Sequence, residues 1–435
     1  MIRILYTIIL VIILSVSVQA QRASYFRRLF VDAEYYLLYE DYRDALPLYM
    51  ELYEKYPNNA NVAYRIGQCY LNIPNQKHRS LSFFELAIKD ITDSYNEGYF
   101  TEKQAPPEAY LNYGRALRIQ YDFEKALDAL NKYKALISGN NSEGAALANH
   151  EIKSIEYAQE SMGTPIDVKF TSVGRTVNSR FPEIMPVVTQ DEEMLVYTSV
   201  QQFYSAIMMS TRRSDIWTHP INLNSQMFAD GPIRTTGISA DGTTLLLARN
   251  DNDIFNLYTS NYDSTNNSWS VISRMPREIN SRSWENYASF SPTADTLYFS
   301  SNRSGGAGGF DIYMSAKVDG EWGEAVNMGE VFNTTFDEIA PVISHDGQKL
   351  FFSSKGHTTM GGFDVFVSYK ENGKWTKPQN LGYPLNTTDN DVFFYPVGNG
   401  ARGYMSRSMP DNAGEDDIYL VEFDVGEEDS KKVEP

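Results

Sequence analysis

Four carboxylate residues recur in phase along the C-terminal two thirds of this 435-residue chain, and carboxylates can hold a cation or act on a substrate. They are Glu183, Glu285, Glu338 and Asp391, and Ile233 breaks the series in between. If the segments that carry them surround one axis, the four side chains form a candidate cation or ligand site at a channel mouth. The alternative, which we favour, is that they pair with basic residues or accept hydrogen bonds from turn N–H groups.

The stretch SSNRSGGAGGFDIYMS, which begins at Ser300, is a second candidate, because a glycine-rich loop beside charged residues can cradle a phosphate. Related stretches begin at Ser353 and Ser406, and no helix is predicted behind them to bind the phosphate. A catalytic loop appears once, whereas a structural unit repeats. We therefore predict structural pairs of a basic and an acidic residue across each loop. The predicted pairs are Arg303 with Asp311, Lys355 with Asp364, and Arg407 with Asp417.

The sequence lacks the common signatures of catalysis and cofactor binding. Its 5 histidines are scattered without a paired-histidine spacing, and the single cysteine, Cys69, has no histidine in register. It contains no nucleophile elbow, Walker A motif or dinucleotide fingerprint. We expect a protein that is not an enzyme and that uses no cofactor or metal. A pair of carboxylates that act as in glycosidases is the remaining enzymatic alternative.

A repeat of 53 residues defines the elements that carry these side chains. Two sets of residues recur at this spacing: Trp269, Trp322 and Trp375, and Asn280, Asn333 and Asn386. Each unit holds four short alternating segments with turns such as Asp346-Gly347, and four-stranded units of this period are β-propeller blades. Five copies are present, and the last stops after three strands. We predict that residues 168–179 supply the missing strand, which leaves the five-bladed ring without a free edge.

The N-terminal third has a helical periodicity and a 34-residue period, with small residues such as Ala33 and Ala45 where two antiparallel helices would approach. This pattern resembles the tetratricopeptide repeat. The resemblance implies a peptide-binding groove, and a solvated or intramolecularly packed face is the alternative. The candidate groove residues are Glu34, Tyr64, Gln68, Asn72, Arg115 and Arg118.

The stretches SHDGQKLFFSS and GGFDIYMS resemble the PD40 repeat, a WD40-like propeller repeat known from the TolB family. The order of helical repeats and propeller is similar to cell-envelope proteins of Bacteroidetes, in which an OmpA-like peptidoglycan-binding domain often follows. Some of those proteins serve in type IX secretion or gliding at the outer membrane. Here we expect no OmpA-like domain, because an acidic tail follows the propeller.

The fold that we expect is α + β and multidomain, with a tetratricopeptide-type array before a five-bladed propeller closed by an N-terminal strand. Residues 1–20 have a positive start and a short apolar stretch, which predict a cleaved signal peptide. The helical array is expected over residues 21–163, the propeller over 164–424, and an acidic disordered tail over 425–435. The formal net charge of −18 argues against a nucleic-acid partner.

These inferences together predict a non-enzymatic scaffold that binds envelope proteins in the periplasm. The resemblance adds association with an outer-membrane secretion or gliding assembly, and the chain is not expected to span a membrane once the signal peptide is removed. A propeller that binds a glycan or a peptidoglycan fragment is the alternative function. A propeller hydrolase is the less favoured alternative.

Overall fold

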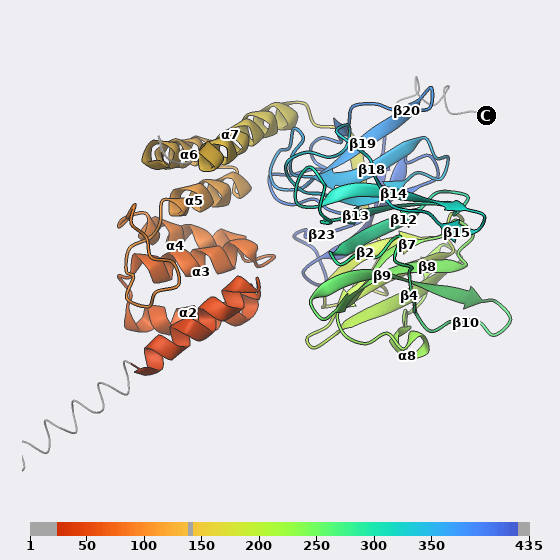
Figure 1. The fold of residues 1–435 in the computed structure, drawn as a ribbon, viewed down its shortest axis with the longest axis horizontal. Coiled ribbons are helices and arrows are strands. Elements are labelled where there is room, and N and C mark those ends of the chain that lie inside the picture. Colours follow the sequence, from red (N-terminus) through yellow and green to blue (C-terminus); the bar gives the residue numbers. More distant parts are fainter. Residues whose placement is uncertain (1–23, 138–141, 425–435) are drawn as a thin grey trace, which may run out of the picture. The chain divides into compact units, whose positions relative to one another are not determined.

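A computed structural model describes residues 24–137 and 142–424, which form two compact units (Figure 1). The helical unit ends at Ile155 and the propeller unit begins at Glu156, inside helix α7 (Ser142–Gly163). The predicted signal peptide and the predicted acidic tail lie outside the described residues. Within the described ranges, no helix is long and apolar enough to cross a membrane.

The helical unit is a series of antiparallel helices, as its small residues predict. Residues 24–38 are helical, and the later elements are α2 (Tyr42–Lys55), α3 (Ala60–Asn72), η1 (Lys77–Arg79), α4 (Ser80–Ala87), α5 (Glu108–Ile119), α6 (Phe123–Ile137) and α7. Helix α3 packs against α4, and α5 packs against α6. Gly67 allows the first approach, because a Cβ there would lie 2.6 Å from the Phe84 ring. Gly114 has the same role beside Leu130.

Residues 88–107 interrupt the helical pattern that the sequence predicted for this third. They form a loop in which Ile91 and Ala105 make an isolated bridge. The Phe100 ring packs edge-on against Phe30 and Tyr56, so the loop shares the core of the first helices. Pro106 and Pro107 end this loop directly before α5, at a helix start where the missing N–H costs no helical hydrogen bond.

The propeller unit has five blades, as predicted (Figure 1). Blade 1 contains β2 (Glu183–Val188), β3 (Met194–Val200), β4 (Ser205–Arg213), β5 (Ile216–Trp217) and β6 (Ile221–Asn222), and the short helix α8 (Asn224–Met227) follows it. Blade 2 contains β7 (Ile233–Ile238), β8 (Thr244–Asp251), β9 (Ile254–Asp263), β10 (Ser268–Trp269) and β11 (Ser273–Arg274). Blade 3 contains β12 (Glu285–Phe290), β13 (Thr296–Ser301), β14 (Asp311–Val318), β15 (Glu321–Trp322) and β16 (Val326–Asn327). Blade 4 contains β17 (Glu338–Ile343), β18 (Lys349–Ser354), β19 (Asp364–Glu371), β20 (Lys374–Trp375) and β21 (Gln379–Asn380). In these four blades the predicted fourth strand is split into two short pieces that both pair with the third strand.

Blade 5 confirms the predicted closure by an N-terminal strand. Its own strands are β22 (Tyr395–Val397), β23 (Arg402–Arg407) and β24 (Asp417–Phe423), and β1 (Val168–Ser172) pairs antiparallel with β24. Asn178 then binds both backbone groups of Ile418, with its Nδ2 donating to the carbonyl at 3.0 Å and its Oδ1 accepting from the N–H at 2.9 Å. Asn333 and Asn386 make the same two-point contact with the third strands of blades 3 and 4.

The innermost strands form a continuous ring around the propeller axis. β2 contacts β7 and β22, β7 contacts β12, β12 contacts β17, and β17 contacts β22. Aromatic side chains fill the space between them: the Tyr287 and Phe393 rings lie 6.2 Å apart, and Phe393 stacks on Tyr395. Tyr287 belongs to blade 3, and Phe393 and Tyr395 belong to blade 5. Side chains from different blades therefore meet near the propeller axis.

Candidate functional site

The structure places the four repeated carboxylates at equivalent points of their blades. Glu183, Glu285 and Glu338 are each the first residue of an innermost strand, and Asp391 precedes β22. All four are buried, with exposures from 0% for Glu285 and Glu338 to 5% for Asp391. Because these side chains are buried, their hydrogen-bond and ion-pair partners determine their protonation and their possible roles.

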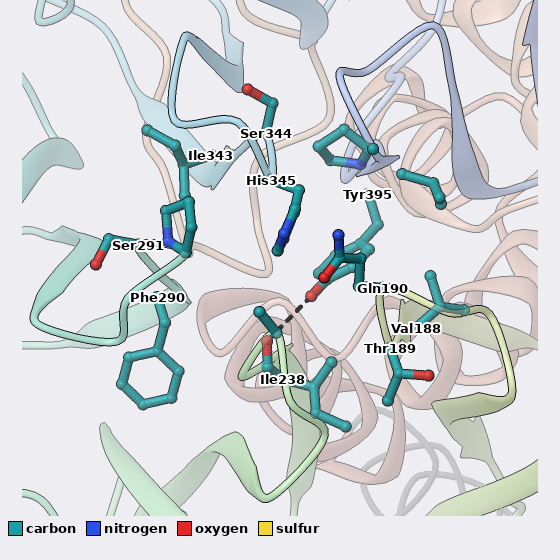
Figure 2. Close-up of a pocket in the computed structure, with 15 residues that line it drawn as sticks. Val188, Thr189, Gln190, Ile238, Phe290, Ser291, Ile343, Ser344, His345 and Tyr395 are labelled. Carbon is teal, nitrogen blue, oxygen red and sulfur yellow. Dashed lines mark hydrogen bonds between the residues drawn. The ribbon is translucent and has the colours of Figure 1, made fainter. Parts of the chain in front are cut away.

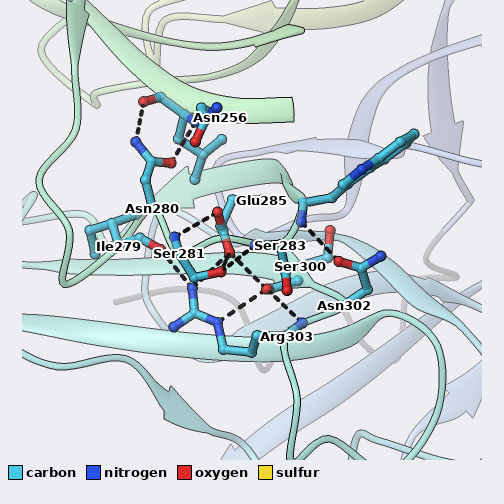
Figure 3. A network of polar contacts seen from close by, with 12 residues as sticks. Asn256, Ile279, Asn280, Ser281, Ser283, Glu285, Ser300, Asn302 and Arg303 are labelled. Atoms are coloured by element: carbon cyan, nitrogen blue, oxygen red, sulfur yellow. Dashed lines mark hydrogen bonds and ion pairs between the residues drawn. The ribbon is translucent and has the colours of Figure 1, made fainter. Parts of the chain in front are cut away.

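Glu285 shows the pattern of contacts in full (Figure 3). Its carboxylate accepts hydrogen bonds from the Ser281 backbone N–H at 2.9 Å and from the Ser281 hydroxyl at 2.6 Å. The Ser301 hydroxyl on β13 donates at 2.9 Å, and the Arg303 guanidinium donates at 3.1 Å. The carboxylate therefore holds the incoming turn, the second strand and one arginine together.

The other three carboxylates have equivalent partners within their own blades. Glu183 is bound by Ser179 and Ser199, Glu338 by Thr334 and Ser354, and Asp391 by Thr387 with Arg407 at 4.0 Å. Burial raises the pKa of Glu183 and of Glu338 to about 7, although hydrogen bonds from these hydroxyl and N–H groups oppose the change. Burial likewise raises the pKa of Asp391 to about 6, against the charge of Arg407.

These contacts do not bring the four carboxylates together around the axis. Within residues 24–137 and 142–424, no group of three or more His, Cys, Asp or Glu side chains could hold a metal ion. Each carboxylate instead accepts turn and hydroxyl donors, as the alternative in the sequence analysis stated.

The predicted pairs across the glycine-rich loops are wrong. Arg303 pairs with Glu285, whereas Asp311 accepts backbone N–H groups from Ala307 at 2.6 Å and Gly308 at 3.1 Å. Loop N–H groups have no strand partner, and the aspartate at the start of β14 is the acceptor that faces them.

The same exchange of partners occurs in the other two predicted pairs. Lys355 pairs with Asp337 at 2.9 Å, and Asp364 accepts from the Met360 N–H. The Arg407 guanidinium donates to the Pro384 carbonyl, and the remaining acid, Asp417, accepts from the N–H groups of the loop before it. The loops are therefore structural, as predicted, but through different bonds.

A small pocket of about 50 Å³ lies where all five innermost strands end (Figure 2). The turn positions that repeat in the sequence, Thr189, Ser291, Ser344 and Val397, lie in its wall. The Tyr395 hydroxyl crosses beneath it and donates to the Ile238 carbonyl at 3.3 Å. A space of this size accommodates a few water molecules at most, so it is not a substrate site.

The candidate groove residues form two polar clusters in the helical unit. In the first, Arg65 lies between Glu34, at 2.9 Å, and Gln68, at 3.1 Å. Gln68 also donates to the Tyr64 hydroxyl, and the Asn72 side chain donates to the Gln68 carbonyl. The loop of residues 88–107 adds Glu97, which is 3.4 Å from Arg65.

The second cluster joins Arg115 and Arg118 to Glu151 of α7. Burial pushes the pKa of Glu151 upward, but the charges of Arg115 and Arg118 outweigh it and hold this pKa at about 2. The sequence analysis named both arginines as candidate groove residues but did not name Glu151. The spacing of residues along one helix does not show which acidic residue of a later helix packs beside it. Of the six candidates, Asn72 is the one whose side chain is exposed.

One group that sequence reasoning missed lies at the opposite end of the axis from the pocket. It combines Arg234 with the rings of Phe255, Trp284 and Tyr287. A shallow hollow of about 480 Å³, lined partly by Arg274, Arg277 and Arg282, belongs to the same loops of blades 2 and 3. The sequence did contain one sign of this group. The series of repeated carboxylates is interrupted at Ile233, and Arg234 is the next residue.

No family model and no curated protein matches the sequence. Among solved structures, TolB from Acinetobacter baumannii is 16% identical, with 64% of this chain and 70% of that chain covered and a TM-score of 0.36. The α-L-arabinofuranosidase from Lactobacillus brevis is 10% identical over 58% of this chain and 92% of that chain, with a TM-score of 0.40. The periplasmic gluconolactonase of Pseudomonas aeruginosa is 10% identical over 54% and 70%, with a TM-score of 0.32. With TM-scores of 0.32 to 0.40, these similarities carry no inference about this chain.

Proposed function

We propose that this chain is a non-enzymatic scaffold of the cell envelope whose helical unit binds partner proteins. The observation that carries the proposal is an exposed apolar row on the helix of residues 24–38. The row consists of Val31, Tyr35 and Leu38 of this helix and Tyr39 directly after it, with exposures of 58% for Tyr35 and 79% for Leu38. Spacings of four, seven and eight residues place these side chains on one face of the helix.

A helix with an apolar face normally buries it against another element. This helix already buries its opposite face, where Phe30 and Ala33 pack into the core. A second apolar face on the first helix of a repeated array is therefore suited to receive an amphipathic helix of another protein. We name Val31, Tyr35, Leu38 and Tyr39 the terminal row.

A non-enzymatic function is supported by the state of the repeated carboxylates. Each one is buried and accepts several hydrogen bonds from its own blade, so none is available to a substrate. The envelope location rests on the composition of residues 1–20. A place in an outer-membrane secretion or gliding assembly is the finer form of the proposal, and it rests on the family resemblance.

The test is recovery of partners from envelope extracts with and without the terminal row. The tagged full chain would be crosslinked mildly in cells and analysed by mass spectrometry, beside a Val31→Ser/Tyr35→Ser/Leu38→Ser variant. Leu136→Ser is the matched control, because Leu136 is an exposed apolar residue of the same unit on α6. Circular dichroism would verify that each variant is folded.

We expect an envelope protein that is enriched in stoichiometric amount with the wild type and with Leu136→Ser. Loss of the terminal row should lower its enrichment at least tenfold, because a few central apolar side chains carry most of the binding free energy of an interface. Equal enrichment with all three proteins would show that the terminal row does not bind the partner, and would contradict the proposal.

A further inference from the structure

Blade 2 lacks both acidic groups that mark this end of the other blades. Ile233 replaces the repeated glutamate, and Asn256 stands where blades 3, 4 and 5 carry aspartate. Asn256 accepts a hydrogen bond from Arg274 and donates one to Asp251. The acids that blade 2 does carry near this end, Asp230 and Asp251, pair with Arg249 and not with Arg234.

Arg234, the second residue of β7, is a cation without a charged partner. Its guanidinium carbon lies 4.1 Å from the centre of the Phe255 ring and 5.7 Å from that of Tyr287. In the part of the chain that the structure describes, its side chain makes no ion pair and no hydrogen bond. Burial lowers the pKa of Arg234, and the only opposing influence is Tyr287.

Other buried or half-buried arginines in the described part of the chain have a carboxylate partner. Arg65 has Glu34, Arg118 has Glu151 and Arg303 has Glu285. Arg234 is half-buried, so its charge is partly desolvated, and a bound anion would supply the counter-charge that the described residues do not. Contact with the face of Phe255 compensates this cost only in part.

Two aromatic rings contact Arg234, and ring contacts lead from one of them, Phe255, to the partly exposed Trp284. Phe255 lies 5.5 Å from Trp284, whose side chain is 36% exposed, and Trp284 lies 6.3 Å from Phe310. The Trp284 indole N–H and the Tyr287 hydroxyl have no acceptor among the residues that the structure covers. Arg234, Trp284 and Tyr287 thus each carry a hydrogen-bond donor group without an acceptor in the described residues.

Exposed arginines of the segment that joins blades 2 and 3 add positive charge at this end. Arg274 reaches Asn256, the neighbour of Phe255, and Arg282 is two residues before Trp284. Both arginines are exposed, as is Arg277, which pairs with Glu278. In a chain with a net charge of −18, such a group of arginines is a local reversal of sign that attracts anions.

We propose that Arg234, Phe255, Trp284 and Tyr287 form a binding site for an acidic sugar residue of a glycan. The guanidinium binds the carboxylate, for which its planar donors are suited. The sugar ring lies against the exposed aromatic faces, and its hydroxyl oxygens accept from Trp284 and Tyr287. A neutral sugar would leave Arg234 unpaired. This inference is independent of the terminal row and of the proposed protein scaffold.

Calorimetric titration of the full chain tests the site. The probes are trigalacturonic acid, a glucuronate-containing disaccharide, N-acetylmuramic acid, neutral galactotriose, and the tripeptide Gly-Gly-Phe with a free carboxylate. We expect at least one acidic sugar to bind at least tenfold more tightly than galactotriose. Arg234→Gln and Trp284→Ala should each weaken that binding at least tenfold, and Arg213→Gln, at an exposed arginine of blade 1, should not.

Three results would overturn the site. They are no binding of any of the three acidic sugars, unchanged affinity in Arg234→Gln, and tighter binding of the tripeptide than of every sugar. Stability gives a second readout that needs no ligand. Because the unliganded guanidinium is unpaired, Arg234→Met should keep or raise the melting temperature. A fall of several degrees would show that Arg234 has a structural partner, which contradicts the proposal.

Discussion

At the residue scale, polar side chains of the propeller form hydrogen bonds that connect strands and turns of the fold. Glu285 joins Ser281, Ser301 and Arg303, and Asn178 joins the two ends of the ring. Buried polar groups are tolerated when their hydrogen bonds are complete. The recurrence of such residues in the sequence therefore indicates that the same contact between a turn and its neighbouring strands recurs from blade to blade.

The raised pKa of Glu338 predicts a particular dependence of stability on pH. A carboxyl group whose pKa is about 7 in the folded protein and near its usual value when unfolded binds its proton more tightly in the folded state. Its contribution to stability is complete below the unfolded pKa and is lost as pH rises through 7. Glu183 contributes in the same direction.

We expect the melting temperature to fall between pH 5 and pH 8, and Glu338→Gln to reduce that slope. Removal of this one group should reduce the pH-dependent loss by up to about 3 kcal/mol, since one pKa unit corresponds to about 1.4 kcal/mol. Calorimetric scans across this range give the slope, and Glu321→Gln, an exposed change of the same type, is the control. A slope that is equal in all three proteins would show that Glu338 titrates as it does in the unfolded chain.

At the scale of elements, one strand closes the propeller. β1 lies between the helical unit and blade 1 in the sequence, yet it completes blade 5 beside β24. The pairing removes the free edges that an open ring would expose. Because Asn178 binds β24 immediately after β1 ends, its contacts help to fix the closure.

Asn178→Ala should therefore destabilise the propeller. The change removes two hydrogen bonds to Ile418 and one to Ser172 inside a buried site, and we expect a loss of about 1–3 kcal/mol. Urea unfolding followed by tryptophan fluorescence measures it, and Asn266→Ala, at an exposed turn, is the control. A loss no greater than that of the control would mean that β1 holds the ring without this residue.

At the scale of the whole molecule, the two units have separate cores. Phe84 and Ala87 belong to a core within the helices, whereas Val187 and Ile233 belong to one within the propeller. Two compact units with their own cores can respond separately to mutation. The chain thus offers a helical surface and a propeller surface as independent binding elements.

Gly67→Ala tests this independence. The added Cβ would meet the Phe84 ring at 2.6 Å, so we expect the helical unit to lose about 1–3 kcal/mol. Amide hydrogen exchange should increase in α3 and α4 and remain unchanged in the blades. Asn178→Ala should give the reverse pattern. Faster exchange across both units in either variant would show that they unfold together.

The sequence by itself determined the five blades, the closure by a strand that begins at residue 168, and the antiparallel helices, because these follow from periodicity and small-residue spacing. The predicted closing segment ran to residue 179, whereas the strand ends at Ser172. It also identified most of the residues at the junctions. The partners of those residues required the tertiary structure. Strand register brings Arg303 to Glu285, and the packing of α7 brings Glu151 to Arg118. The spacing of the repeats in the sequence does not show which residues these contacts join. The same reason explains Arg234: its neighbours Phe255 and Tyr287 come from different strands, so only the folded ring shows that this cation lacks a counter-charge.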